Sequence, residues 1–389
     1  MLDIKMKILL KVSIVFIALS FFYFFKPVNK SSQNSLSLSE AEKIEKNIYN
    51  DFKKEIIVTR SDEMEDQVIK LMDKKIKFDI KHFGEQGEDG WSLFISLHGG
   101  GGTTESENNR LWNRHKTLYE LENGILFTPR SPSNTWNMWF QSHVDTFFNR
   151  IIQNMIAFHN VDPNKIYIMG RSAGGDGIYQ VAPRMADRFA AAAMSAGHPN
   201  DSSPLGLRNT AFTIHMGEND SLYNRNDMAV KWGNDLKKLN EEDPEGYRYY
   251  IKIYKNKGHW MDNLEASALD WMSDFIRNPY PSKVVWKQGN VLHKRFYWLR
   301  NEDPSFGDLI ECNIDDQIIT VLSSSSSKIT IQLNDDLVDM DREITVNYLG
   351  RQLFKGFVYR DIDIIKRSIR EYGDPKSVYY GEIRLTLDS

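Results

Sequence analysis

The segment Gly170–Gly175 reads GRSAGG, and its Gly-x-Ser-x-Gly core decides the fold. It directly follows Lys165–Met169 (KIYIM), a β-branched and aromatic run typical of a buried strand. The residues after it, Asp176–Ala182, can begin a helix. A strand joined to a helix by this motif forms a nucleophile elbow, a sharp turn that strains the serine backbone and needs glycine beside it. We therefore predict that Ser172 presents its hydroxyl at the end of a β-sheet as a nucleophile.

The composition excludes several classes of function. The 389 residues are enough for two domains, and acidic and basic residues are mixed to a formal net charge of −4. Because no basic stripe is present, we expect no nucleic-acid partner. The one cysteine, Cys312, cannot form an intrachain disulfide, and the nine histidines include no His-Glu-x-x-His pattern. We therefore expect neither a metal nor a cofactor.

The N-terminus differs from this soluble composition. Lys5, Lys7 and Lys11 precede an apolar run over residues 12–25, which is the pattern of an export signal. The bulky aromatic end of the run offers no small-residue cleavage site. We therefore expect residues 1–29 to be a signal anchor or a signal peptide, with the anchor favoured. The membrane would be a partner and the rest of the chain would be extracytoplasmic.

The rest of the chain divides into three parts. Residues 30–74 are a linker and helical lead-in, with a polar tether, a helix from Glu40 to about Lys54 and a second amphipathic stretch, Met64–Met72. Residues 75–280 alternate strands with helices, which predicts a mostly parallel, doubly wound sheet. Residues 281–389 show short period-2 runs and one helix, which predicts a small β-rich, sandwich-like domain.

The boundaries expected within the α/β part follow from these patterns. Buried or half-buried strands are expected at residues 75–81, 91–97, 125–127, 166–169, 190–194, 211–214 and 249–253. Helices are expected at residues 146–158, 179–188, 227–239 and 264–276.

A serine nucleophile needs a base, and His259 is the best candidate. It lies just after the last strand of the α/β part and before its final helix, where a loop can bring the imidazole onto Ser172. His198 lies in a polar loop that could line the cleft, His215 is expected inside a strand, and His293 lies beyond the domain break.

The acid that orients the base is expected after the strand at residues 211–214. Glu218 and Asp220 both follow that strand, and Asp220 has the favoured Gly-x-x-Asp spacing. Glu218 would instead hold the loop, and Asp262 is a weaker third candidate. The order Ser172, Asp220, His259 is the order found in hydrolases with this elbow.

The oxyanion hole needs two backbone N–H groups that point at the developing negative charge. One is expected from Ala173, the residue after the nucleophile. The other is expected from His98–Gly102 (HGGGG), which ends a strand, with Gly100 and Gly101 as the candidate donors. A flexible glycine turn is the alternative interpretation of this segment.

Tryptophans supply candidate substrate contacts. Trp112, Trp136 and Trp260 could stack on a sugar or an aromatic ester, although tryptophans more often anchor cores and loops. The acidic run from Asn334 to Asp341 could bind calcium, but a solvated turn is the favoured interpretation.

With these residues placed, residues 75–277 resemble the α/β-hydrolases, and are most similar to bacterial esterases related to polyhydroxybutyrate depolymerases, feruloyl esterases and dienelactone hydrolases. The segments that carry the resemblance are His98–Gly102, Gly170–Gly175, Gly217–Asp220 and Gly258–Trp260. The resemblance implies a serine esterase with an acyl-enzyme intermediate. On that basis Ser172 attacks the ester, His259 relays the proton and Asp220 orients His259.

Other functions remain open. A peptidase of the prolyl-oligopeptidase type would use the same triad, and specificity depends on the pocket rather than on the acyl-transfer machinery. A non-catalytic binding protein would be expected to lack a triad member, and all three are present. A surface polysaccharide-binding protein led by the β domain would expose tryptophans there, above all Trp286 and Trp298.

Overall fold

The computed structural model describes residues 36–387. The predicted export segment, residues 1–29, lies outside the described residues, so its role stays a prediction. Within the described part of the chain, none of the helices combines the length and apolar content that a membrane span requires. Contacts between residues join the chain from Leu36 onward into one unit.

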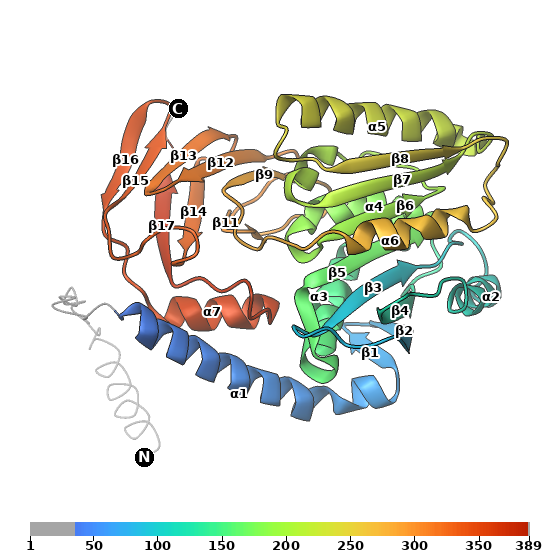
Figure 1. Ribbon diagram of the computed structural model, residues 1–389, viewed down its shortest axis with the longest axis horizontal. Helices are drawn as coiled ribbons and strands as arrows, with labels where there is room; N and C mark the ends of the chain where they lie inside the picture. Colours follow the sequence, from blue (N-terminus) through green and yellow to red (C-terminus); the bar gives the residue numbers. More distant parts are fainter. Residues whose placement is uncertain (1–35, 388–389) are drawn as a thin grey trace, which may run out of the picture. The chain divides into compact units, whose positions relative to one another are not determined.

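One eight-stranded sheet forms the centre of the α/β part (Figure 1). Its strands lie in the order β1-β2-β4-β3-β5-β6-β7-β8. Neighbouring strands from β4 to β8 pair in parallel, whereas β1 and β2 pair antiparallel. This confirms the predicted mostly parallel sheet. The strands are β1 (Val68–Leu71), β2 (Lys74–Phe83), β3 (Trp91–Leu97), β4 (Gly124–Arg130), β5 (Val161–Arg171), β6 (Ala191–Ser195), β7 (Ala211–Gly217) and β8 (Tyr249–Tyr254).

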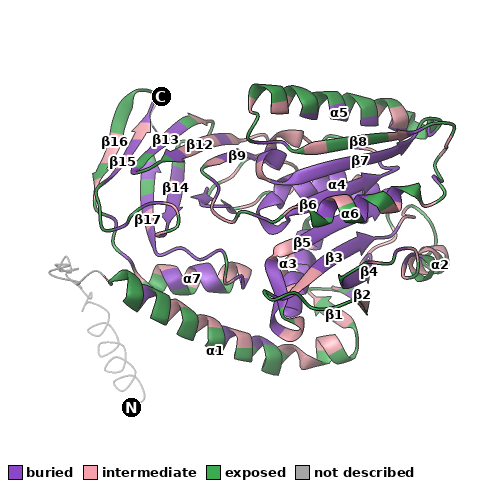
Figure 2. Ribbon diagram, in the orientation of Figure 1, coloured by how far each residue is buried: buried purple, intermediate pink, exposed green. Residues whose placement is uncertain are grey.

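Helices bury both faces of the sheet, because side chains of a strand alternate between the two faces. On β5, Ile166 and Ile168 pack into a core shared with α3, α4 and α5. Tyr167 and Met169 point the other way, into a smaller core shared with α6. Figure 2 shows the central strands and α4 buried and much of α5 exposed. The helices are α2 (Glu105–His115), α3 (Ser142–His159), α4 (Ala173–Arg184), α5 (Arg225–Glu242) and α6 (Ala268–Ser273), with 3-10 turns η1 (Ala186–Arg188), η2 (Pro204–Asn209), η3 (Leu222–Asn224) and η4 (Leu264–Ser267).

Two further sheets form the β-rich C-terminal part. One has the order β10-β11-β14-β17 and the other β16-β15-β13-β12-β9. Their shared core contains Trp286 and Trp298, both almost fully buried, and it also receives side chains of α1 and α7. The elements are β9 (Lys283–Lys287), β10 (Arg295–Phe296), β11 (Leu299–Arg300), β12 (Leu309–Asp315), β13 (Ile318–Ser324), β14 (Lys328–Leu333), β15 (Ile344–Tyr348), β16 (Arg351–Gly356), α7 (Ile362–Tyr372) and β17 (Gly381–Thr386).

The lead-in differs from its prediction. Helix α1 is longer than expected and runs over Leu38–Glu65, with Ser37 and Glu40 forming a capping box at its start. The stretch Met64–Met72 is predicted as one amphipathic segment, but its first two residues end α1 and Val68–Leu71 form β1, in which Ile69 pairs with Ile76 of β2. The sheet therefore begins before residue 75, because β1 finds backbone partners on the edge of β2.

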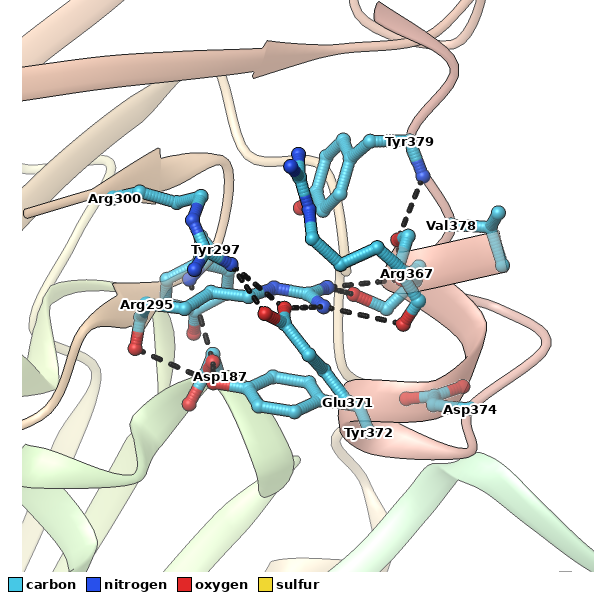
Figure 3. Close-up of polar contacts among 12 residues, drawn as sticks. Asp187, Arg295, Tyr297, Arg300, Arg367, Glu371, Tyr372, Asp374, Val378 and Tyr379 are labelled. Atoms are coloured by element: carbon cyan, nitrogen blue, oxygen red, sulfur yellow. Dashed lines mark hydrogen bonds and ion pairs between the residues drawn. The ribbon is translucent and has the colours of Figure 1, made fainter. Parts of the chain in front are cut away.

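Buried charged and polar groups join the α/β part to the C-terminal part. Asp187, in η1, accepts a hydrogen bond of 2.7 Å from the hydroxyl of Tyr372, at the end of α7 (Figure 3). Just beyond α7, the Asp374 carboxylate lies 2.8 Å from Arg277 Nη2 and 3.4 Å from Arg188 Nη1. These contacts join residues 187, 188 and 277 to residues 372 and 374, which are far apart in the sequence. The C-terminal part is therefore fixed against the α/β part by directional contacts as well as apolar packing.

Candidate active site

The turn between β5 and α4 holds Ser172 in a strained conformation. Its φ is 58° and its ψ is −123°, a combination that costs energy for a residue with a side chain. The neighbouring glycines are required because a Cβ on Gly170 would lie 2.3 Å from the carbonyl oxygen of Gly174, and a Cβ on Gly174 would lie 2.2 Å from that of Leu97. The Ser172 N–H donates to Ser195 O at 2.9 Å, which ties the turn to β6.

Ser172, His259 and Asp220 form one hydrogen-bonded chain. His259 Nε2 lies 2.9 Å from Ser172 Oγ, and His259 Nδ1 lies 2.8 Å from Asp220 Oδ2. The carboxylate can only accept, so the neutral imidazole carries its proton on Nδ1 and its Nε2 accepts the serine O–H. Asp220 is 3% exposed, whereas the His259 side chain is 42% exposed. The geometry therefore places a proton acceptor on an accessible serine, with a buried anion behind it.

The other two candidate acids are engaged elsewhere. Glu218 Oε2 accepts the N–H of Asn256 at 2.8 Å, so Glu218 holds the loop that leads to His259. Asp262 forms an ion pair with Lys257 within that loop. Of the three carboxylates considered from the sequence, Asp220 is the one that the structure brings to the imidazole.

The remaining downstream histidines occupy other environments. His215, on β7, is fully buried between Thr213 and the hydroxyl of Tyr254, as expected for a core residue. His293 Nε2 lies 2.7 Å from Asp145 Oδ2 and so links the C-terminal part to α3. His198 N–H donates to Asp176, in the first turn of α4.

Asp176 and His198 lie close to the candidate catalytic residues. Burial raises the pKa of Asp176 to about 6, against the opposing effects of the His198 N–H and of the positive charge of Arg225. Asp176 was not singled out from the sequence, although its position four residues after the serine, in the first turn of the helix, was visible there.

The glycine segment after β3 lies beside the serine. A Cβ on Gly99 would lie 3.1 Å from Ser172 Cβ, so the peptide that joins Gly99 to Gly100 is adjacent to the nucleophile. Gly100 has a φ of 121°, which only glycine adopts without strain. The prediction of Gly101 as a donor to an oxyanion is corrected, because its N–H donates to Asn108 Oδ1 at 2.9 Å.

A buried polar network holds this glycine segment, so it is not a flexible turn. Asn108, in α2, also donates to Asn134 Oδ1, which accepts from Arg130. His98 Nε2 accepts the N–H of Ser131, so its Nδ1 carries the proton and donates to Gly99 O at 2.7 Å. Burial lowers the pKa of His98 to about 3, which keeps the ring neutral and this tautomer fixed.

The three candidate tryptophans have different surroundings. Trp136 is 61% exposed and lies beside the glycine segment, since a Cβ on Gly102 would be 3.8 Å from Trp136 Cβ. Trp260 is 38% exposed and follows His259 directly. Trp112 is partly buried, and its Nε1–H donates to Thr128 O at 3.0 Å, so its indole N–H serves the fold. Of the three, Trp136 and Trp260 are the exposed ones.

Tyr223 is an exposed aromatic residue on the loop after Asp220. It is 68% exposed with a φ of 59°, a strained conformation for a non-glycine residue. The guanidinium of Arg225 lies 5.0 Å from the centre of its ring.

The structure offers no metal site in residues 36–387, where no group of three or more His, Cys, Asp or Glu side chains could hold an ion. The acidic run considered for calcium pairs with an arginine. Arg360 lies between Asp335, with a hydrogen bond of 3.0 Å, and Asp341, with one of 2.7 Å. These carboxylates are therefore engaged by a guanidinium.

The strand order, the parallel connections and the strained serine turn between β5 and α4 define an α/β-hydrolase fold, here followed by a β-rich C-terminal part. No family model matches the sequence. The chain is 31% identical over 203 residues to a bifunctional acetylxylan esterase/xylanase from Neocallimastix patriciarum. The match covers 51% of this chain and 26% of that protein, so the chain corresponds to about a quarter of that relative.

Solved structures similar to this chain include three esterase-type proteins. A ferulic acid esterase gives a TM-score of 0.40 with 17% identity, covering 53% of this chain and 96% of that one. The poly(3-hydroxybutyrate) depolymerase LpqC from Bordetella parapertussis gives 0.38 with 13% identity, covering 53% and 86%. The feruloyl esterase module from Clostridium thermocellum gives 0.36 with 14% identity, covering 52% and 83%. These values are too low to support an argument about activity, and the fold assignment rests on the topology.

Proposed function

We propose that the protein is a serine hydrolase that cleaves carboxylic esters through an acyl-enzyme intermediate. The observation that carries the proposal is the hydrogen-bonded chain from Ser172 Oγ through His259 to the buried Asp220 carboxylate. A serine hydroxyl becomes a nucleophile when a base takes its proton, and this chain supplies the base and the anion that stabilises its protonated form.

In the proposed reaction, Ser172 Oγ bonds to the ester carbonyl carbon while its proton passes to His259 Nε2. The carbonyl electron pair moves to oxygen and forms an oxyanion. When the oxyanion collapses, the bond to the alcohol breaks and the alkoxide takes the proton from His259. A water molecule then attacks the acyl-serine in the same way, releasing the acid and restoring Ser172. Asp220 keeps the proton on Nδ1 throughout and does not itself become protonated.

We propose the N–H groups of Ala173 and Gly100 as the oxyanion donors. Ala173 is the first residue of α4, so its N–H has no partner within the helix. The Gly99–Gly100 peptide lies beside Ser172, and the network behind it holds it in place. Donors fixed in advance stabilise the developing charge without a cost of reorganisation.

Trp136 and Trp260 are proposed to contact the substrate near the serine. Both are exposed; Trp136 lies beside the glycine segment and Trp260 directly follows His259. An aromatic face at this position suits a planar acyl group or a sugar ring.

The test is hydrolysis of p-nitrophenyl acyl esters of increasing chain length by residues 31–389, measured beside Ser172→Ala. The proposal expects ester turnover in the first protein and its loss in the second. Turnover of aminoacyl p-nitroanilides in preference to esters would assign a peptidase instead. Equal ester turnover by the two proteins would refute the serine mechanism.

We further propose that residues 1–29 direct the chain out of the cytoplasm and anchor it. The basic start and apolar run of this segment support the proposal. Fractionation of cells that express the full chain would place it in the membrane fraction, and removal of residues 1–29 would release it. Recovery of the full chain in the cytoplasmic fraction would contradict the proposal.

A further inference from the structure

Arg171, the residue before the nucleophile, reaches the loop that carries the base. It is the last residue of β5, and its Nη2 donates to the backbone carbonyl of His259 at 2.8 Å. Its guanidinium also lies 4.1 Å from the centre of the Trp260 ring. One side chain therefore connects the nucleophile turn to both the histidine and the residue after it, over a sequence separation of 88 residues.

Behind Arg171 lies a buried carboxylate, Glu265, in η4. Glu265 is fully buried, and its Oε1 lies 3.4 Å from Arg171 Nε. Neither of its carboxylate oxygens has a side-chain hydrogen-bond partner among the described residues. Burial raises the pKa of Glu265, and Arg171 is the cation that opposes this rise. A buried charge is expensive unless it is paired, which makes the pair mutually dependent.

The loop is held on both sides of His259, by the Asn219 N–H, which donates to Lys257 O at 2.8 Å, and by the fully buried Met261. The His259 side chain is 42% exposed, and a Cβ on Gly258 would meet open space. Glu218 holds the loop three residues earlier, through the N–H of Asn256. The Arg171 contact is made at His259 itself, so it bears directly on where the imidazole sits.

We propose that Arg171 is a positioning residue, anchored by Glu265, that holds the His259 loop so that Nε2 stays within hydrogen-bond reach of Ser172. This inference rests on the proposed function. A guanidinium suits the task because its planar fork can bond a carbonyl, face a carboxylate and stack on an indole at once, which an ammonium cannot do. Misplacement of a catalytic group by about 1 Å can lower the rate about 10²-fold.

The experiment compares Arg171→Met, Arg171→Lys, Glu265→Gln and the double variant Arg171→Met/Glu265→Gln. Arg171→Met is expected to lower kcat about 10- to 100-fold with KM within about threefold of wild type, because Trp136 and the glycine segment are untouched and Trp260 loses only one stacked guanidinium. It is also expected to lower Tm, because Glu265 is left buried without its cation. Arg171→Lys should fall between wild type and Arg171→Met.

The double variant separates positioning from charge burial. With both charges removed, Tm should recover toward wild type while kcat stays at least about tenfold low. Recovery of kcat together with Tm would overturn the proposal, because Arg171 would then serve only to neutralise Glu265. A kcat within about threefold of wild type in Arg171→Met would overturn it as well.

Arg114→Met is the matched control. The Arg114 guanidinium also lies over the Trp260 ring, at 4.7 Å from its centre, but it stacks on the ring without the bond to His259 that Arg171 makes. Its loss should leave kcat within about twofold. A loss equal to that of Arg171→Met would assign the effect to Trp260 and overturn the proposal.

A readout independent of turnover is the low-field proton NMR signal of His259 Nδ1–H bonded to Asp220. The signal should be present in wild type, absent in His259→Ala, and broadened or lost in the double variant. An unchanged signal in the double variant would contradict positioning. If Ser172→Ala retained full hydrolysis, the proposed function would be wrong. The NMR signal would still show whether Arg171 positions the His259 imidazole, so the two proposals can fail separately.

Discussion

Replacing Asp220 by asparagine tests whether the Asp220 carboxylate fixes which ring nitrogen of His259 carries the proton. In the wild type the carboxylate accepts from Nδ1 at 2.8 Å, and this leaves Nε2 free to accept from Ser172. An amide N–H₂ turned toward Nδ1 would make that nitrogen an acceptor and move the ring proton to Nε2. The base would then face the serine with its proton already in place, while the fold would change little.

The expected loss for Asp220→Asn is about 10³- to 10⁴-fold in kcat, which corresponds to about 4–5.5 kcal/mol of transition-state stabilisation. The upper figure is the loss known for the same change in a serine protease triad. The lower figure allows for the 42% exposure of His259, which lets water and ring motion recover part of the active tautomer. The assay is steady-state hydrolysis of a p-nitrophenyl ester, with circular dichroism to verify folding.

Glu218→Gln is the matched control for this prediction. The glutamine amide oxygen can still accept the N–H of Asn256, which Glu218 Oε2 accepts at 2.8 Å in the wild type. The control should therefore keep kcat within about threefold. If kcat fell less than tenfold in Asp220→Asn but fell strongly in Glu218→Gln, Glu218 rather than Asp220 would be the acid that orients His259.

Three further changes test the surroundings of the site. Gly174→Ala places a Cβ 2.2 Å from Leu97 O, so it should lower the free energy of unfolding by about 1–3 kcal/mol, measured with urea, and should also lower kcat. An unchanged free energy of unfolding would contradict the close packing of this turn. Burial lowers the pKa of His98 to about 3, so between about pH 6.5 and pH 3 the folded protein binds fewer protons than the unfolded chain. The free energy of unfolding should therefore fall as the pH drops through this range, by at most about 1.4 kcal/mol per pH unit. His98→Gln should reduce this pH dependence in urea unfolding, and an unchanged pH dependence would contradict the prediction. Asp374→Asn removes the carboxylate that lies 2.8 Å from Arg277, so it should lower the free energy of unfolding by about 3–5 kcal/mol in urea. A loss below about 1 kcal/mol would show that the contact between the α/β part and the C-terminal part does not depend on this pair.

Local patterns were enough to predict the sheet and the order of the chemical groups. Alternating apolar runs and the elbow motif are short-range signals, and the structure brings Ser172, Asp220 and His259 together at the ends of β5, β7 and β8. The choice of Asp220 over Glu218 depended on spacing alone, and their different contacts appear only in three dimensions.

Long-range contacts decide the parts that the sequence did not reveal. The stretch that forms β1 has an amphipathic pattern, and it becomes a strand because the edge of β2 supplies backbone partners. Gly101 looked equivalent to Gly100 within a run of glycines, and only the position of Asn108 shows that its N–H is already bonded. Arg171 stood in a variable position of the motif, with no local sign of its contact to His259.

In the C-terminal part, too, local patterns predicted the strands but not their long-range contacts. Its period-2 runs predicted strands, but the partners of each strand could not be derived from them, including the parallel pairing of β13 with β15. The burial of Trp286 and Trp298 removes the feature that would have favoured a polysaccharide-binding surface on those residues. Acidic residues that suggested calcium instead engage Arg360.

Detection of the acyl-enzyme is the most direct test of the proposed serine mechanism. Rapid mixing of residues 31–389 with p-nitrophenyl acetate should give a burst of p-nitrophenolate close to one equivalent if deacylation is the slower step. Acid quenching and mass spectrometry of the peptides should then place an acetyl group on Ser172. We expect this adduct in the wild type and, at a reduced rate, in Asp220→Asn, and we expect none in Ser172→Ala. An acetyl group on another residue, or hydrolysis that persists unchanged in Ser172→Ala, would contradict it.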